Sequence, residues 1–158
     1  MQNINQLKTL FKVKDLYSFT LYPNLKEEVI INALLKDIKD YDLPKEVFNL
    51  LLEAWNSRFW VTHGYDGATI IKNKKHPAIA NFLHDYMWRF GMGGYKSDFI
   101  YKKLLPITGY KNTTALKRFY IIRLAWLFHY KWKHIFKDNK LPISINVNNL
   151  YIKLKEHI

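Results

Sequence analysis

The chain contains no cysteine, and it has only six glycines and five prolines among its 158 residues. Without cysteine, neither a disulfide framework nor a thiolate metal site can form. Hydrophobic residues make up 49% of the chain and aromatic residues 16%, a composition that excludes a disordered protein. A chain of this length is expected to fold as one domain, here residues 1–158, around a single core.

Long hydrophobic runs and a secretory signal are also missing. The most apolar segment, residues 119–128, is ten residues long and includes Arg123, whereas a membrane-spanning helix needs about 20 apolar residues. Residues 1–11 lack the cationic start, apolar block and cleavage site of a secretory signal. We therefore expect no transmembrane segment and no export by that route.

Acidic residues are scarce in the second part of the chain. Residues 1–56 carry seven lysines and eight acids, so this N-terminal part is near neutral, whereas residues 57–158 carry 18 Lys and Arg against five acids. A basic surface favours an anionic partner such as nucleic acid, a lipid headgroup or a phosphorylated small molecule. The alternative is a lysine-rich surface that only keeps the protein soluble.

Hydrophobic periodicity and capping residues predict a mainly helical chain. We expect helices within residues 24–42, 43–56, 77–90, 95–105 and 112–136. Residues 7–23 and 59–62 are β-prone, and residues 143–158 fit either a strand or a short helix. The predicted fold class is mainly α with a minor β element (α+β): a helical hairpin core with a short strand and loop before it.

Two ionisable residues lie in the middle of the helix expected at 77–90, which is apolar on nearly every side. A helix of that kind is buried, and His84 and Asp85 lie about 100° apart around its axis, so at least one of them should be partly enclosed. A buried carboxylate needs a charged partner, hydrogen bonds or a metal ion. For Asp85 the ordinary partner is Arg89, one helical turn further on.

The turn at 91–94, Gly-Met-Gly-Gly, is short enough to fold the next helix back antiparallel. At about 1.5 Å rise per residue, His84 and Asp98 then come level across the hairpin. A carboxylate facing an imidazole fixes its tautomer and raises its basicity, as a general base that activates water requires. Alternatively, Asp98 is only an acid favoured at a helix N-terminus.

Residues 64–69, Gly-Tyr-Asp-Gly-Ala-Thr, form a loop rich in glycine. Its backbone carbonyls could bind a hard cation such as Ca²⁺, with Asp66 and Asp85 supplying charge. The alternative is an ordinary turn with Asp66 at its tip.

Residues 111–140 combine eight Lys and Arg with aromatic side chains and a single acid. Such a segment can neutralise phosphates and stack bases, or lie at a lipid interface, with Arg118, Lys131, Trp132 and Lys133 as the expected contacts. The alternative is a core helix whose aromatic face packs inward while its lysines are solvated.

Residues 58–126 resemble an uncharacterised family of bacteriophage and prophage proteins. The family pattern is a Thr-Asp-Gly-Ala-Ser loop, a His-Asp-Tyr-x-Tyr helix and an Ala-Asp pair opening a helix. It maps onto Asp66–Ala68, onto His84–Tyr86 and onto Asp98; Trp88 stands in place of the second tyrosine. The resemblance implies a phage setting, so we expect the protein in the host cytoplasm or in a phage particle. It implies no reaction.

The same residues are more weakly similar to the phospholipase A-two group. There a glycine-rich calcium loop precedes a His-Asp-x-x-Tyr helix, and an aspartate on an antiparallel helix orients the histidine. The similarity implies His84 as the base, Asp85 as a calcium ligand and Asp98 as the orienting residue. Trp88 occupies the position of the tyrosine whose hydroxyl supports that aspartate.

Two functional hypotheses follow. In the first, the chain is a small phage-type protein with a cation-dependent, hydrolase-like site: His84 and Asp98 are catalytic, Asp85 and Asp66 bind metal, and the substrate is anionic, such as a phospholipid. In the second, it is a non-enzymatic phage component that binds nucleic acid, a virion partner or a host protein, and His84 and Asp85 are structural.

Overall fold

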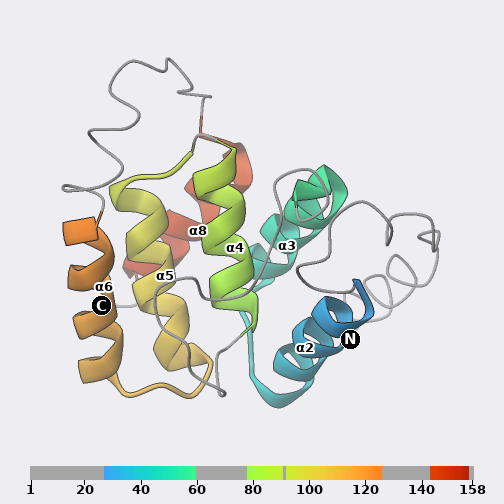
Figure 1. Cartoon of the computed structure of the whole chain (residues 1–158), viewed down its shortest axis with the longest axis horizontal. Helices are drawn as coiled ribbons and strands as arrows, with labels where there is room; N and C mark the ends of the chain where they lie inside the picture. Colours follow the sequence, from blue (N-terminus) through green and yellow to red (C-terminus); the bar gives the residue numbers. More distant parts are fainter. Residues whose placement is uncertain (1–26, 60–77, 91, 126–142, 157–158) are drawn as a thin grey trace.

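The computed structural model describes residues 27–59, 78–90, 92–125 and 143–156. These ranges form six helices: α2 (Glu27–Asp40), α3 (Lys45–Ser57), α4 (Ala78–Arg89), α5 (Tyr95–Ile107), α6 (Asn112–Ala125) and α8 (Ile145–Glu156). α6, α5 and α4 lie side by side with α6 at the edge, while α3 and α2 lie on the other side of α4 (Figure 1). α8 packs against both α3 and α5.

The predicted minor β element is wrong for the described part of the chain, which contains no strand. The C-terminal segment that fitted either structure is α8, because Val147, Leu150 and Leu154 recur at helical spacing and are all buried. The Ser144 hydroxyl accepts the backbone N–H of Val147 at 3.2 Å and caps the helix.

Phe59, where we expected a strand to begin, has helical backbone instead. Its side chain is completely buried and lies 4.8 Å from the Phe82 ring, so core packing determines its conformation. The remaining β-prone residues, 7–23 and 60–62, lie outside the described ranges.

The predicted helices α2 and α3 are confirmed. Ile30, Leu34 and Ile38 of α2 are buried one helical turn apart. On α3 the residues of the expected apolar face are buried: Val47, Leu50, Leu51 and Ala54. Pro44 is the residue that precedes the first helical turn.

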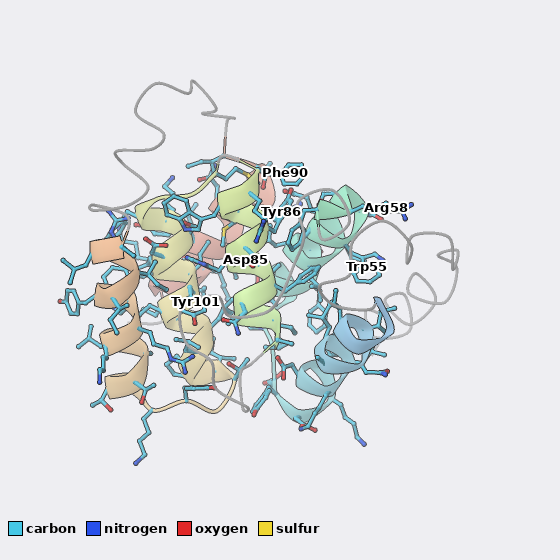
Figure 2. The ribbon with its side chains drawn as sticks, viewed as in Figure 1. Trp55, Arg58, Asp85, Tyr86, Phe90 and Tyr101 are labelled. Atoms are coloured by element: carbon cyan, nitrogen blue, oxygen red, sulfur yellow. The ribbon has the colours of Figure 1, made fainter. Side chains whose placement is uncertain are left out.

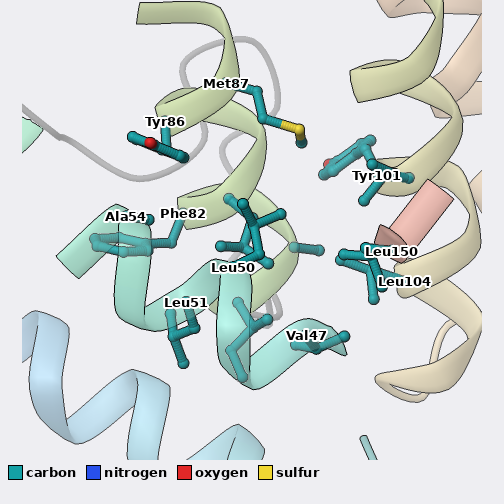
Figure 3. Close-up of a cluster of buried hydrophobic side chains, with 14 of the residues drawn as sticks. Val47, Leu50, Leu51, Ala54, Phe82, Tyr86, Met87, Tyr101, Leu104 and Leu150 are labelled. Carbon is teal, nitrogen blue, oxygen red and sulfur yellow. The ribbon is translucent and has the colours of Figure 1, made fainter. Parts of the chain in front are cut away.

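One hydrophobic cluster contains side chains from all six helices (Figure 3 shows part of it). Representative members are Leu34, Trp55, Phe82, Leu104, Ala115 and Leu150. The described helices therefore share one core. Within the described residues, no helix has the length and apolarity needed to cross a membrane.

The predicted hairpin is formed by α4 and α5, which pack against each other. Gly94 precedes α5 with φ of 146°, a backbone conformation that favours glycine. The Ser97 hydroxyl accepts the N–H of Gly94 at 2.9 Å and fixes the start of α5. This connection turns α5 back along α4, and it places Asp98 in the first turn of α5.

Candidate functional site

The hairpin brings His84 of α4 and Asp98 of α5 into direct contact. Nε2 of His84 lies 2.8 Å from Oδ1 of Asp98. The Asp98 side chain is completely buried, whereas the His84 side chain is 15% exposed. The predicted facing of these two residues is confirmed, and part of the imidazole reaches solvent.

The geometry assigns the tautomer of His84. An ionised carboxylate can only accept hydrogen bonds, so a neutral imidazole at 2.8 Å from it must carry its proton on Nε2. The lone pair of the ring then lies on Nδ1. This is the arrangement in which an imidazole can take a proton from water while a carboxylate stabilises the resulting cation.

Trp88 of α4 is a second side chain in contact with the Asp98 carboxylate. Its Nε1 lies 3.0 Å from Asp98 Oδ1 and also 3.0 Å from His84 Nε2. Since His84 Nε2 is itself a donor, the indole N–H donates to the carboxylate oxygen. The indole therefore supplies the same kind of support to Asp98 that a tyrosine hydroxyl at this position would.

Arg123 of α6 binds the other carboxylate oxygen. Its Nη1 donates to Asp98 Oδ2 at 2.9 Å. Asp98 thus accepts hydrogen bonds from groups on two helices besides its own, and the guanidinium balances its charge. Buried carboxylates are found with such partners, because an isolated one would be costly to desolvate.

Gly93 in the hairpin turn lets the Trp88 ring lie against the backbone. A Cβ atom at this position would lie only 2.2 Å from the Trp88 ring carbons Cδ2 and Cε3. Any larger residue must therefore push the indole away. The lack of a side chain at Gly93 therefore allows the orientation in which the Trp88 indole N–H donates to Asp98.

Asp85 lies beside this network, on α4, near Tyr101 of α5 (Figure 2). Its Oδ2 is 4.0 Å from Nη2 of Arg89, the ordinary partner that was the alternative to a metal ion. Burial raises the pKa of the Tyr101 phenol, and the charge of Arg118 opposes that rise.

The other predicted binding residues are placed differently. Arg118 is only 4% exposed, and its guanidinium lies 4.7 Å from the centre of the Tyr110 ring. It is therefore a buried packing residue and not a surface contact. Asp66, Lys131, Trp132 and Lys133 lie outside the described residues.

The described residues do not by themselves form a metal site. They contain no group of three His, Asp or Glu side chains placed to hold an ion. Asp85 is the one predicted calcium ligand among them, and it has a guanidinium beside it. Calcium binding by Asp85 and Asp66 stays a prediction.

A shallow pocket of about 390 Å³ lies between α3 and α8. Its lining residues are Lys45, Glu46, Asn49, Asn149, Ile152, Lys153 and Glu156. None of them belongs to the network around Asp98. The pocket therefore does not bear on the chemistry of His84.

Sequence reasoning missed Arg123 as a site residue. The available signal was a single cation within the apolar run at 119–128, the same kind of signal that singled out His84 in α4. A cation that faces a neighbouring helix across a buried interface needs an anionic partner. Asp98 was the acid that needed one.

Models of known protein families, curated proteins and solved structures were each compared with the chain, and none matches it. The resemblance to the phage family and the similarity to the phospholipase A-two group therefore stay predictions.

Proposed function

We propose that the protein is a hydrolase in which His84 is the general base and Asp98 the residue that orients it. One observation carries the proposal: a fully buried carboxylate lies 2.8 Å from Nε2 of a partly exposed imidazole. The basic second half of the chain supports an anionic substrate. The phage setting is part of the proposal and rests on the resemblance alone.

In the proposed reaction, Nδ1 of His84 removes a proton from a water molecule as that water attacks the carbonyl carbon or phosphorus of an ester. The imidazolium that forms keeps its Nε2–H bond to Asp98, whose negative charge stabilises it. The proton then passes from Nδ1 to the departing alkoxide. Trp88 and Arg123 hold Asp98 in place during these steps, and they touch no reacting atom.

Calcium is the cation that the proposal includes, because the loop at 64–69 and Asp85 offer the oxygen ligands that it prefers. Bound there, it would polarise the ester oxygen. Calorimetric titration of the parent protein and of Asp85→Asn with Ca²⁺ and Zn²⁺ tests this part. Heat of Ca²⁺ binding that the variant lacks supports Asp85 as a ligand, and the absence of heat in both proteins removes calcium from the proposal.

The catalytic part is tested by hydrolysis of two anionic probes: bis(p-nitrophenyl) phosphate and vesicles that contain phosphatidylglycerol. We expect His84→Gln to lower the rate about 100-fold or more, as loss of a general base does. Tyr86→Phe is the matched control, since it removes one polar contact from the same helix but leaves Asp98 untouched.

A second candidate function, that of a non-enzymatic binding protein, is favoured by the number of groups that converge on Asp98. Because this carboxylate connects α4, α5 and α6, the network could serve only to stabilise the helices of a non-enzymatic protein that binds nucleic acid, a virion partner or a host protein. An intact parent protein that hydrolyses neither probe, with His84→Gln losing stability but nothing else, would favour this second function.

A further inference from the structure

The outward face of α6 carries a stripe of exposed apolar residues. Leu116, Tyr120 and Leu124 are 42%, 58% and 53% exposed and follow one another at intervals of four residues. At about 100° per residue they fall within a sector of roughly 80° on one side of the helix. We refer to these three residues as the α6 stripe.

Cations border the stripe on both sides. By the same helical geometry, Lys117 lies beyond Leu124 on one side, and Arg123 lies before Leu116 on the other. From Phe99 to Ala125 the chain carries six Lys and Arg and no Asp or Glu. Arg118 is buried and Arg123 is bound to Asp98, so the positive charge of this face comes from lysines such as Lys117 and Lys102.

Aromatic rings extend this surface toward α5. The exposed Tyr95 ring lies 6.0 Å from the Phe119 ring, edge to face. The amino group of Lys102 lies 4.9 Å above the same Phe119 ring. The exposed Tyr95 ring and the amino group of Lys102 thus both lie against the buried Phe119 ring, next to the α6 stripe.

We infer that the α6 stripe docks on an anionic lipid surface. Exposed leucines between flanking cations fit an interface where acyl chains lie beneath negative headgroups, and tyrosine is favoured at that depth. Nucleic acid would use the cations and the aromatic rings, but it offers no apolar layer for Leu116 and Leu124. α6 lies at the edge of the described helices (Figure 1), and the three side chains of the α6 stripe are exposed there.

The surface adjoins the proposed catalytic residues through Arg123. This guanidinium binds Asp98 on its inner side, and it lies 5.9 Å from the centre of the exposed Tyr95 ring. The docking inference does not depend on catalysis, because it rests on the outer face of α6. We therefore expect His84→Gln to bind lipid as the parent protein does.

The test is co-sedimentation of the full chain with phosphatidylcholine vesicles, with and without phosphatidylglycerol. We expect binding to the anionic vesicles only, weakened by added salt. The double variant Leu116→Ser/Leu124→Ser should bind about tenfold more weakly, since two inserted leucines are lost. The matched control is Ile145→Ser/Ile152→Ser on α8, whose isoleucines are 74% and 54% exposed; it should bind unchanged.

Three results would overturn the inference. The first is no binding to anionic vesicles by the folded parent protein. The second is an equal loss in the α6 and α8 double variants, with native circular dichroism in both. The third is a dimer in analytical ultracentrifugation that the α6 double variant abolishes, because a second copy of the chain would then cover the stripe.

Discussion

Two carboxylates bind side chains of α4 from neighbouring helices, the buried Asp98 of α5 and the half-buried Glu53 of α3, and they differ in the donors that they accept. Asp98 of α5 binds an imidazole, an indole and a guanidinium. Glu53 of α3 binds the Tyr86 hydroxyl at 2.9 Å and the Asn146 amide, which are neutral groups.

The comparison sets a contact between a carboxylate and neutral groups against a network that includes an imidazole. Burial, together with the bond to Glu53, raises the pKa of Tyr86 above its ordinary range, so this phenol stays a hydrogen-bond donor at any physiological pH. An imidazole, by contrast, is the side chain that most readily exchanges a proton near neutral pH. Only the Asp98 network contains one.

The largest effect should come from neutralising the two carboxylates in turn. Asp98→Asn leaves Arg123 without its counter-ion in a buried site, so we expect a loss of about 3 kcal/mol or more in the free energy of unfolding. Glu53→Gln keeps an oxygen for one of its two neutral donors and places an amide NH2 group against the other, so it should cost about 1 kcal/mol. Urea denaturation measures both. Equal losses would contradict the distinction between the two networks.

The next effect concerns the hairpin turn. Gly93→Ala should cost about 1–3 kcal/mol, because the added methyl group displaces the Trp88 ring. Introduced into Trp88→Phe, whose smaller ring leaves room, the same substitution should cost clearly less. Strictly additive losses in the double variant would show that Gly93 and the indole are not coupled.

The smallest effect concerns a third carboxylate at α4. Asp37 of α2 accepts the N–H of Ile79 at 3.0 Å and so caps the start of α4. Burial raises its pKa above the ordinary carboxyl value. The native state then holds this proton at pH values where the unfolded chain has released it, so stability falls as pH rises from about 4 toward the raised pKa.

Asp37→Asn should remove that dependence. We therefore expect the unfolding free energy of the parent protein to decline over this pH range by more than that of the variant, as followed by urea denaturation at successive pH values. Parallel pH profiles of the two proteins would show that Asp37 does not titrate differently on folding.

The sequence was sufficient for features that depend on local spacing. The apolar faces of α2 and α3, the short turn at 91–94 and the facing of His84 and Asp98 all follow from helical periodicity and rise per residue. The short turn makes the last of these reliable, because it restricts how α5 can return along α4.

Features that depend on packing were not predictable in the same way. Arg123 reaches Asp98 from 25 residues away, and no local pattern places α6 beside α5. From the sequence, Trp88 could be read only as a residue that lacks the hydroxyl of the tyrosine at this position in the resembling families. That its indole N–H points at Asp98 could not be predicted, because the ring orientation depends on the contact with Gly93. Residues 143–158 combine β-prone side chains with apolar residues at helical spacing, so the sequence fits either structure. Burial of Val147, Leu150 and Leu154 in the core stabilises the helix.

The central claim is that His84 donates its Nε2–H to Asp98 and keeps Nδ1 as the basic nitrogen. Long-range ¹H–¹⁵N correlation spectra identify the tautomer directly, and comparison with His84→Gln assigns the signal among the six histidines. We expect the neutral ring to carry its proton on Nε2 in the parent protein. A proton on Nδ1, with Nε2 as the bare nitrogen, would contradict both the assigned hydrogen bond and the proposed base.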